Sequence, residues 1–217
     1  MDFIDQSIQH YAEQHTSQEP VWLKELNRFT HTSVLKPRML SGHLQGRFIS
    51  MMSRLIKPRF VLDIGTYTGY SALCLAEGLS ENGIVYTIDN NEEVMHTASK
   101  FFSSSPYKDK IRALTGDALS IIADLNKEVD YWDIIWMDAE KSEYPSYYDL
   151  VIEKLKPGGL ILADNVLWSG KVANSDALTK DKDTAVLDAF NKQILEDSRV
   201  ENLLLPIRDG IMMARKL

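Results

Sequence analysis

Two apolar stretches in the second half of the chain end in side chains that carry oxygen. The first, DIIWMD, ends at Asp138, and the second, LILAD, ends at Asp164 and is followed by Asn165. If they are neighbouring parallel strands, their carboxyl ends lie about 5 Å apart, and the side chains can converge above the sheet. Two carboxylates and an amide oxygen form a hard ligand set that suits Mg²⁺, Ca²⁺ or Mn²⁺. Zinc is disfavoured, because no cysteine and no well-spaced histidine pair accompanies the set.

An acidic residue at a strand end also commonly caps the following helix, which is the alternative interpretation for Asp138 and Asp164. Two acidic strand ends in succession favour the cation site, because without a cation their like charges would repel each other. Lys141 follows Asp138 by three residues. Near a divalent cation its ammonium form is disfavoured, so Lys141 could lose its proton and act as a general base. Trp168 could form an apolar wall for an aromatic ring or be an ordinary core residue.

The run VLDIGTYTGYS has the pattern of a strand, a bend and a helix. Gly65 and Gly69 flank the bend, where a Cβ atom would hinder the approach of a ligand to the backbone. The helix that follows offers free N–H groups to an anion. A purely structural joint explains the bend equally well. Its spacing differs from the G-x-G-x-x-G fingerprint of dinucleotide-binding proteins, which argues against a nicotinamide enzyme.

Two other strand ends suit a nucleoside bound beside this bend. Asp89 ends the run IVYTID and could accept hydrogen bonds from both hydroxyls of a ribose. Its alternative role is the N-cap of the next helix, for which Asn90 and Asn91 are also available. Ala118 follows the third apolar run, in the sequence GDA, and would lie beside an adenine.

The spacing of apolar residues predicts the elements that position these side chains. From residue 60 on, short apolar runs at 60–64, 84–89, 111–116, 133–138 and 159–164 alternate with segments of helical spacing. This alternation predicts a doubly wound, mainly parallel α/β sheet with helices on both faces. The last two runs, around 200–207 and 210–217, are joined by a link too short for a parallel crossover. They are therefore predicted to pair as an antiparallel hairpin that reverses the last strand.

Residues 1–57 are predicted to be helical. Apolar residues recur at helical spacing in three stretches that begin near Phe3, Trp22 and Phe48. We interpret the chain as one domain, with a helical extension over 1–57 and an α/β core over 58–217.

The overall composition excludes several classes of partner. With 217 residues, a formal net charge of −7 and a pI near 5.3, the chain lacks the general positive charge that supports binding to nucleic acid or an anionic membrane. The lone cysteine, Cys74, cannot form an intrachain disulfide and is predicted to be buried. A basic and apolar leader is absent from the N-terminus, and no apolar run is long enough to cross a bilayer, so we predict a cytoplasmic location.

Together these segments resemble the cation-dependent O-methyltransferases of the caffeoyl-coenzyme A and catechol type, especially the bacterial members. The likeness extends from about Met39 to the C-terminus and is carried by VLDIGTYTGYSALCLAEGL, MDAEKSEYPSYYDL, KPGGLILADNVLWSGKV and LPIRDGIMMARK. It implies a seven-stranded, Rossmann-like methyltransferase sheet with its last strand antiparallel. It also implies a homodimer, with the N-terminal helices contributing to a substrate lid and to the dimer contact.

The resemblance assigns a role to each matching position. Asp138, Asp164 and Asn165 would ligate the metal, and Lys141 would be the base at a catalytic centre that includes Asp138. The implied contacts of S-adenosylmethionine are Met39, Ser41, Asp63, Gly65, Ser71, Asp89, Ala118 and Asp138.

The chain departs from the family pattern at several places. Asp63 replaces a usual glutamate, DAEK with Glu140 replaces the frequent DADK, and His43 has no counterpart and no assigned role. We expect Glu140 to point away from the metal. The segment after Trp168 shows no clear basic cluster for a coenzyme A phosphate, although Lys171, Lys180 and Lys182 could serve.

The resemblance implies methyl transfer from S-adenosylmethionine to a phenolic oxygen of a small, catechol-like substrate. A divalent cation would chelate two vicinal hydroxyls, and Lys141 would remove the proton. One alternative is a metal-independent methyltransferase that acts on another small molecule or on RNA, although the acidic chain makes RNA a poor substrate. Another is a nucleoside-binding module without catalysis, in which the acidic strand ends serve only as caps.

Overall fold

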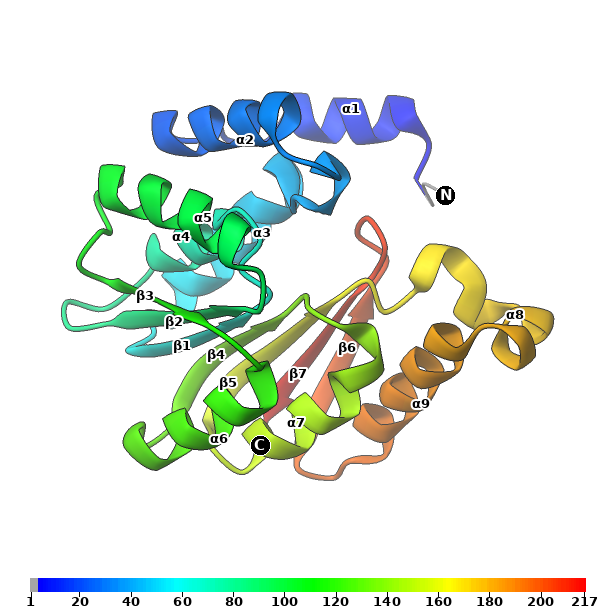
Figure 1. The fold of residues 1–217 in the computed structure, drawn as a ribbon. Helices are drawn as coiled ribbons and strands as arrows, with labels where there is room; N and C mark the ends of the chain where they lie inside the picture. Colours follow the sequence, from blue (N-terminus) through cyan, green and yellow to red (C-terminus); the bar gives the residue numbers. More distant parts are fainter. Residues whose placement is uncertain (1–3) are drawn as a thin grey trace.

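A twisted sheet runs through the molecule, with helices on both of its faces (Figure 1). The structure is a computed structural model that describes residues 4–217, and the predicted start near Phe3 lies outside the described residues. Within this range the sheet has seven strands in the order β3-β2-β1-β4-β5-β7-β6. The strands are β1 (Phe60–Ile64), β2 (Ile84–Asp89), β3 (Ile111–Thr115), β4 (Trp132–Met137), β5 (Leu155–Asp164), β6 (Val200–Leu205) and β7 (Ile211–Lys216).

The predicted doubly wound, mainly parallel sheet is confirmed. The pairs β3–β2, β2–β1, β1–β4 and β4–β5 are parallel, whereas β7 runs antiparallel to both of its neighbours. The reversed strand lies one position inside the edge, and β6 forms the edge itself. The connection through α9 brings β6 into the sheet in the same direction as β5, and the hairpin then reverses β7, which inserts between them.

Helices fill the connections and cover the two faces. The α-helices are α1 (Gln6–Gln14), α2 (Val21–Ser33), α3 (Gly42–Ile56), α4 (Tyr70–Ala76), α5 (Glu92–Ser104), α6 (Ala118–Glu128), α7 (Tyr144–Ile152), α8 (Ser175–Lys180) and α9 (Lys182–Glu196). Short 3₁₀ helices are η1 (Pro37–Met39), η2 (Lys141–Glu143) and η3 (Trp168–Ala173). No helix within residues 4–217 combines the length and the apolar character that a membrane span requires.

Two apolar clusters, one on each face, hold the helices to the sheet. Successive strand residues point to opposite faces, so Leu62 packs with α6, α7 and α9, whereas Val61 packs with α2, α3, α4 and α5. The predicted burial of Cys74 is confirmed, since its side chain lies fully inside the second cluster.

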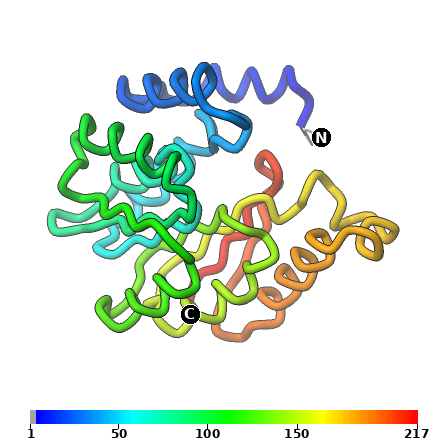
Figure 2. The backbone as a smooth tube through the Cα atoms, in the orientation of Figure 1, coloured from blue at the N-terminus to red at the C-terminus, as the bar shows by residue number. Residues whose placement is uncertain are grey.

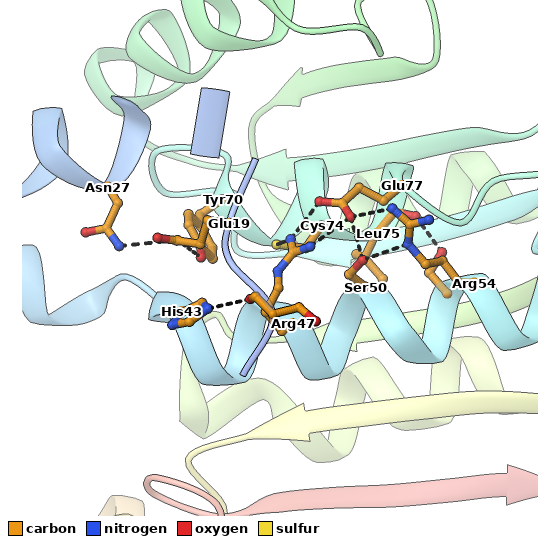
Figure 3. Close-up of polar contacts among 12 residues, drawn as sticks. Glu19, Asn27, His43, Arg47, Ser50, Arg54, Tyr70, Cys74, Leu75 and Glu77 are labelled. Carbon is orange, nitrogen blue, oxygen red and sulfur yellow. Dashed lines mark hydrogen bonds and ion pairs between the residues drawn. The ribbon is translucent and has the colours of Figure 1, made fainter. Parts of the chain in front are cut away.

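The N-terminal helices join the second face. On α2, Phe29 packs against Phe101 with ring centroids 5.3 Å apart, and Trp22 meets Tyr107 edge-on at 6.2 Å. The loop between α1 and α2 is fastened by two polar contacts (Figure 3). His43 Nε2 lies 2.8 Å from the carbonyl oxygen of Ser17, and the Tyr70 hydroxyl donates to Glu19. His43 therefore links the loop to the start of α3.

A buried carboxylate joins α3 to the end of α4. Glu77 accepts hydrogen bonds from Arg47 at 2.6 Å, Ser50 at 2.7 Å and Arg54 at 2.9 Å (Figure 3). Burial alone would raise the pKa of Glu77, but these three donors lower it below its ordinary value. The ionised glutamate is thus compensated, as a buried charge must be.

The α3–α4 contact provides a test of the packing. A Cβ atom at Gly78 would collide with the backbone of Ser53 and Arg54 on α3. Since backbone atoms cannot move aside cheaply, we expect Gly78→Ala to lower the free energy of unfolding by about 2 kcal/mol in urea titrations. The control is Lys100→Ala at an exposed position of α5, which should change it by about 0.5 kcal/mol or less. Equal stability of both variants would contradict this account.

Candidate active site

The carboxyl ends of the parallel strands open into one cavity of about 1030 Å³. Of the predicted site residues, those that line it are Met39, Ser41, Gly65, Ser71, Asp89, Ala118, Asp138, Lys141, Asp164 and Asn165. Asp63 is the exception and does not line the cavity. Side chains from widely separated segments therefore meet at one place, at the edge of the sheet where parallel α/β proteins bind ligands.

The bend after β1 passes directly beside the end of β4. Gly65 has φ +103°, and a Cβ atom there would collide with the backbone of Asp138. The amide groups of Gly65 and Thr66 both donate to the carbonyl oxygen of Ile88, at 2.9 and 3.1 Å. Glycine is thus required both by the backbone conformation and by the close approach.

Asp89 holds this bend rather than capping a helix. Its Oδ2 accepts the amide of Tyr67 at 2.8 Å, and its Oδ1 accepts the amide of Asn91 at 3.0 Å. The N-cap of α5 is Asn91, whose side chain accepts the amide of Glu93. The capping interpretation of Asp89 is therefore wrong, and its carboxylate is fixed at the cavity wall. Ala118 also lines the cavity, as the first residue of α6.

Asp63 lies beneath the bend and is fully buried. Its Oδ2 accepts the Thr87 hydroxyl at 2.5 Å, and Thr87 in turn contacts the hydroxyl of Thr66 at 2.6 Å. Its Oδ1 has no hydrogen-bond partner of regular geometry among the described residues. Burial raises the pKa of Asp63 to about 7, although hydrogen bonds from Thr87 and Ser71 oppose the shift.

Asp138 and Asp164 stand at adjacent strand ends. Asp138 directly follows Met137, whose register partner on β5 is Ala163, and Asp164 directly follows Ala163. Neither acid caps the next helical segment, because the residues at the N-caps of η2 and η3 are Glu140 and Leu167. The capping alternative is therefore wrong for both acids.

Lys141 places a positive charge beside the acid pair. Its Nζ lies 2.7 Å from Asp138 Oδ1 and 2.8 Å from the Tyr144 hydroxyl. Burial alone would lower the pKa of Lys141, but Asp138 and Tyr144 raise it above its ordinary value. Burial raises the pKa of Asp164 to about 7, and the negative charge of Asp138 adds to the shift. The acid pair thus stabilises the positive charge of Lys141.

Tyr144 fixes the two strand ends and was not identified from the sequence. Its buried hydroxyl lies 3.0 Å from the carbonyl oxygens of both Met137 and Asp164. The only sequence signal is its position three residues after Lys141, on the same face of a helical turn. Gln45 and Arg208, which hydrogen-bond to each other beside the segment at Leu40, gave no comparable signal.

Asn165 has φ +62°, a left-handed conformation that asparagine tolerates. Its backbone amide donates to Asp164 Oδ1 at 2.8 Å. Across residues 4–217, no group of three or more His, Cys, Asp or Glu side chains is placed to hold a metal ion. A cation beside Asp138 and Asp164 would therefore need further ligands such as the Asn165 amide oxygen, water or a bound substrate.

Trp168 combines the two interpretations of its role. It lines the cavity and also packs against the apolar cluster of α6, α7 and α9. Lys171 Nζ lies 5.8 Å from the centre of the Trp168 ring.

Glu140 is exposed and accepts a hydrogen bond from the backbone amide of Ser142 at 3.4 Å.

Comparison with known proteins identifies the family. The family model for O-methyltransferases matches residues 13–217. A probable caffeoyl-CoA O-methyltransferase of Dictyostelium discoideum is 32% identical over 213 residues, which cover 97% of this chain and 92% of the relative. A flavonoid 3',5'-methyltransferase of Vitis vinifera is 33% identical over 180 residues, 80% of this chain and 77% of the relative. This chain belongs to the O-methyltransferase family.

A solved structure agrees with this assignment. The O-methyltransferase of Bacillus cereus in complex with S-adenosylhomocysteine has a TM-score of 0.87 and 27% identity, covering 97% of each chain. The enzyme is accordingly an S-adenosylmethionine-dependent O-methyltransferase, as the sequence motifs indicated. Its cavity suits a nucleoside cofactor, because it lies at the carboxyl ends of the strands beside the bend at Gly65, and the Asp89 carboxylate at its wall can accept hydrogen bonds from ribose hydroxyls.

The buried Asp63 predicts a pH dependence of stability in the absence of cofactor. Its pKa is about 7 when folded, against an ordinary value of 3.8. A raised folded pKa gives stability that is present below about pH 4 and is lost as the pH rises toward about 7. Asp63→Asn carries no such proton. Its free energy of unfolding, relative to that of the parent protein, should therefore increase by on the order of 1–3 kcal/mol between about pH 5 and about pH 8.

Urea titrations at the two pH values measure this difference. Asp176→Asn, an exchange at an exposed position on α8, is the matched control and should show no such change. A constant difference between the Asp63→Asn variant and the parent protein across this range would contradict the assigned pKa.

Proposed function

We propose that the enzyme methylates one of two vicinal hydroxyls on a small, catechol-like phenol, and that a divalent cation held by Asp138, Asp164 and Asn165 positions the acceptor. The observation that carries the proposal is the convergence of two acidic strand ends in the cavity that is also lined by the bend at Gly65. Oxygen donors of this kind favour Mg²⁺, with Ca²⁺ or Mn²⁺ as substitutes.

Different residues are proposed to bind the cofactor and the acceptor. When bound, S-adenosylmethionine supplies the methyl group and a divalent cation supplies the positive charge that favours an ionised hydroxyl. Met39, Ser41 and Ser71 would bind the methionine side of the cofactor, and Asp89 its ribose. Ala118 would lie against the adenine. The fixed geometry of these groups would place methyl and acceptor oxygen in line, which accounts for much of the rate.

Lys141 is proposed to take the proton of the acceptor hydroxyl at its Nζ. In the structure its positive charge is stabilised by Asp138. A cation that binds Asp138 would compete with this ion pair and repel the ammonium, which favours the neutral amine that a base requires. Tyr144 would keep Nζ in place through its 2.8 Å hydrogen bond.

A small acceptor agrees better with the chain than a coenzyme A ester does. The relatives named above act, by their names, on a caffeoyl-CoA ester and on flavonoids, which share a phenolic ring. Two of the three lysines considered for a coenzyme A phosphate are paired with acids. Lys171 lies 2.6 Å from Asp181, and Lys180 lies 3.8 Å from Asp176. Trp168 offers an aromatic wall for the ring of the acceptor.

We also propose that the enzyme acts as a homodimer in the cytoplasm, as the family resemblance implies. Met51 and Leu55 on α3 are 60% and 71% exposed and lie one helical turn apart, which supports an apolar contact with a second copy. Sedimentation of the parent protein and of a Met51→Lys variant tests this, since only the parent should dimerise.

Metal dependence is tested at Asp164. We expect Asp164→Ala, or excess chelator with the parent enzyme, to lower kcat/KM by about 100-fold or more, because the charge that stabilises the ionised hydroxyl is lost. The affinity for S-adenosylhomocysteine, measured by calorimetry, should stay within a few-fold. Asp176→Ala on α8 serves as the control with full activity. Comparable turnover in chelator and in Mg²⁺ would exclude the proposal.

The role of Lys141 is tested by Lys141→Met. Loss of a general base should lower kcat about 10²- to 10⁴-fold, whereas the affinity for S-adenosylhomocysteine should be retained. Steady-state assays with a catechol and Mg²⁺ measure this, with Lys180→Met as the control for loss of an exposed lysine. A Lys141→Met variant with unchanged kcat would assign proton removal to solvent or another group.

A further inference from the structure

The tight turn between β6 and β7 carries Arg208, whose backbone has a conformation that favours glycine. Its φ is +51°, in the left-handed region, and the turn also contains Gly210 at φ +88°. A residue with a Cβ atom adopts this conformation at a cost in free energy, and it persists where other contacts hold it in place. The side chain of Arg208 makes such contacts.

The guanidinium of Arg208 reaches the segment that joins α2 to α3. Figure 2 shows the turn extending toward this segment. Nη1 donates to the carbonyl oxygen of Leu40 at 2.8 Å and to Gln45 Oε1 at 2.8 Å, and it also contacts the carbonyl oxygen of Ser41. Nη2 lies 3.4 Å from the carbonyl oxygen of Arg38. One side chain from the end of the chain thus fastens the entry to α3.

The segment itself has few backbone hydrogen bonds. The amides of Met39 and Leu40 close the short η1 helix, at 3.0 and 3.2 Å. Within residues 4–217, no backbone amide donates to the carbonyl oxygen of Leu40, a residue that is only 4% exposed. A buried carbonyl group requires a donor, and Arg208 provides it.

The fastened segment forms part of the cavity wall. Met39, Leu40 and Ser41 all line the cavity, and Met39 and Ser41 are proposed contacts of S-adenosylmethionine. When only one conformation of a segment binds a ligand, the apparent affinity falls with the fraction of molecules that adopt it. A donor that holds the segment in the free enzyme therefore strengthens cofactor binding without touching the cofactor.

We propose that Arg208 is a positioning residue for S-adenosylmethionine, which holds Met39 and Ser41 in their binding conformation before the cofactor arrives. This inference rests on the proposed contacts of these two residues with the cofactor. It also explains the unfavourable backbone conformation of Arg208. Glycine would suit φ +51° better, but it has no side chain that could reach Leu40.

Arg208→Gly separates positioning from a role in the turn. Glycine removes the guanidinium and the backbone strain together, so a residue needed only for the turn would be replaced without loss. We expect the dissociation constant of S-adenosylhomocysteine, measured by calorimetry, to rise about ten-fold, as it would if the segment spent about a tenth of its time in the binding conformation. This titration requires neither an acceptor nor a metal ion.

Steady-state assays with a catechol and Mg²⁺ provide a second measurement. The KM for S-adenosylmethionine should rise by a factor similar to that of the dissociation constant. The kcat at saturating cofactor should stay within about two-fold, because the bound cofactor then holds the segment itself. A general loss of structure would lower kcat as well.

Rescue tests whether the guanidinium itself is responsible. Millimolar guanidinium chloride should restore part of the affinity of Arg208→Gly, because free guanidinium can donate to the same carbonyl oxygens, whereas NaCl at equal ionic strength should not. Arg208→Lys should weaken S-adenosylhomocysteine only about three-fold, because an ammonium group keeps the charge but reaches fewer acceptors.

The control is Arg199→Met, just before β6. Arg199 forms ion pairs with Asp197 and Glu153 and does not line the cavity, so its loss should leave the affinity unchanged. Near-ultraviolet circular dichroism checks that each variant is folded. If Arg208→Gly does not fold, Arg208→Asn replaces it with the same expectation, since asparagine also tolerates a left-handed backbone.

An unchanged affinity of Arg208→Gly for S-adenosylhomocysteine would overturn the positioning role, and so would equal rescue by guanidinium and by NaCl. Met39→Ala distinguishes this failure from an error in the cofactor contacts. It should weaken S-adenosylhomocysteine several-fold, because it removes an apolar contact. If neither variant changes the affinity, the proposed cofactor contacts are wrong. If only Met39→Ala does, those contacts stand and the role of Arg208 fails alone.

Discussion

The repulsion between two carboxylates at adjacent strand ends is the constraint around which the site is arranged. Asp164 is only 2% exposed, so water does little to screen it from Asp138. Two contacts stabilise this pair: Lys141, after β4, forms an ion pair with Asp138, and the backbone amide of Asn165 donates to Asp164. The divalent cation proposed for this site would relieve the same repulsion more completely.

The sheet order explains why these groups meet. From β1 the chain adds β2 and β3 on one side, and β4 and β5 on the other. The connections after β1 and β4 therefore leave the sheet on opposite faces, and a crevice remains between them. The bend at Gly65 borders this crevice and lies directly against the backbone of Asp138, which places the bend beside the acid pair. Separate parts of the chain can therefore bind the methyl donor and the acceptor on the two sides of one crevice.

Many supporting contacts connect residues far apart in the sequence. Tyr144 joins two strand ends, Asp89 joins the bend to the start of α5, and Arg208 joins the last hairpin to the segment before α3. Each acts on backbone groups or on another side chain rather than on a ligand. Such contacts keep the binding groups in place before a ligand arrives, which reduces the ordering cost of binding.

The sequence alone was sufficient for the alternation of strands and helices, for the reversed last strand and for most residues at the cavity, because these depend on local periodicity and on where each apolar run ends. Tertiary structure decided what local patterns leave open. Asp63 is buried beneath the bend, Asn91 rather than Asp89 caps α5, and Gln45 meets Arg208 across 163 residues of chain. Hydrogen-bond partners at such separation are selected by the packing of whole elements, which no local spacing records.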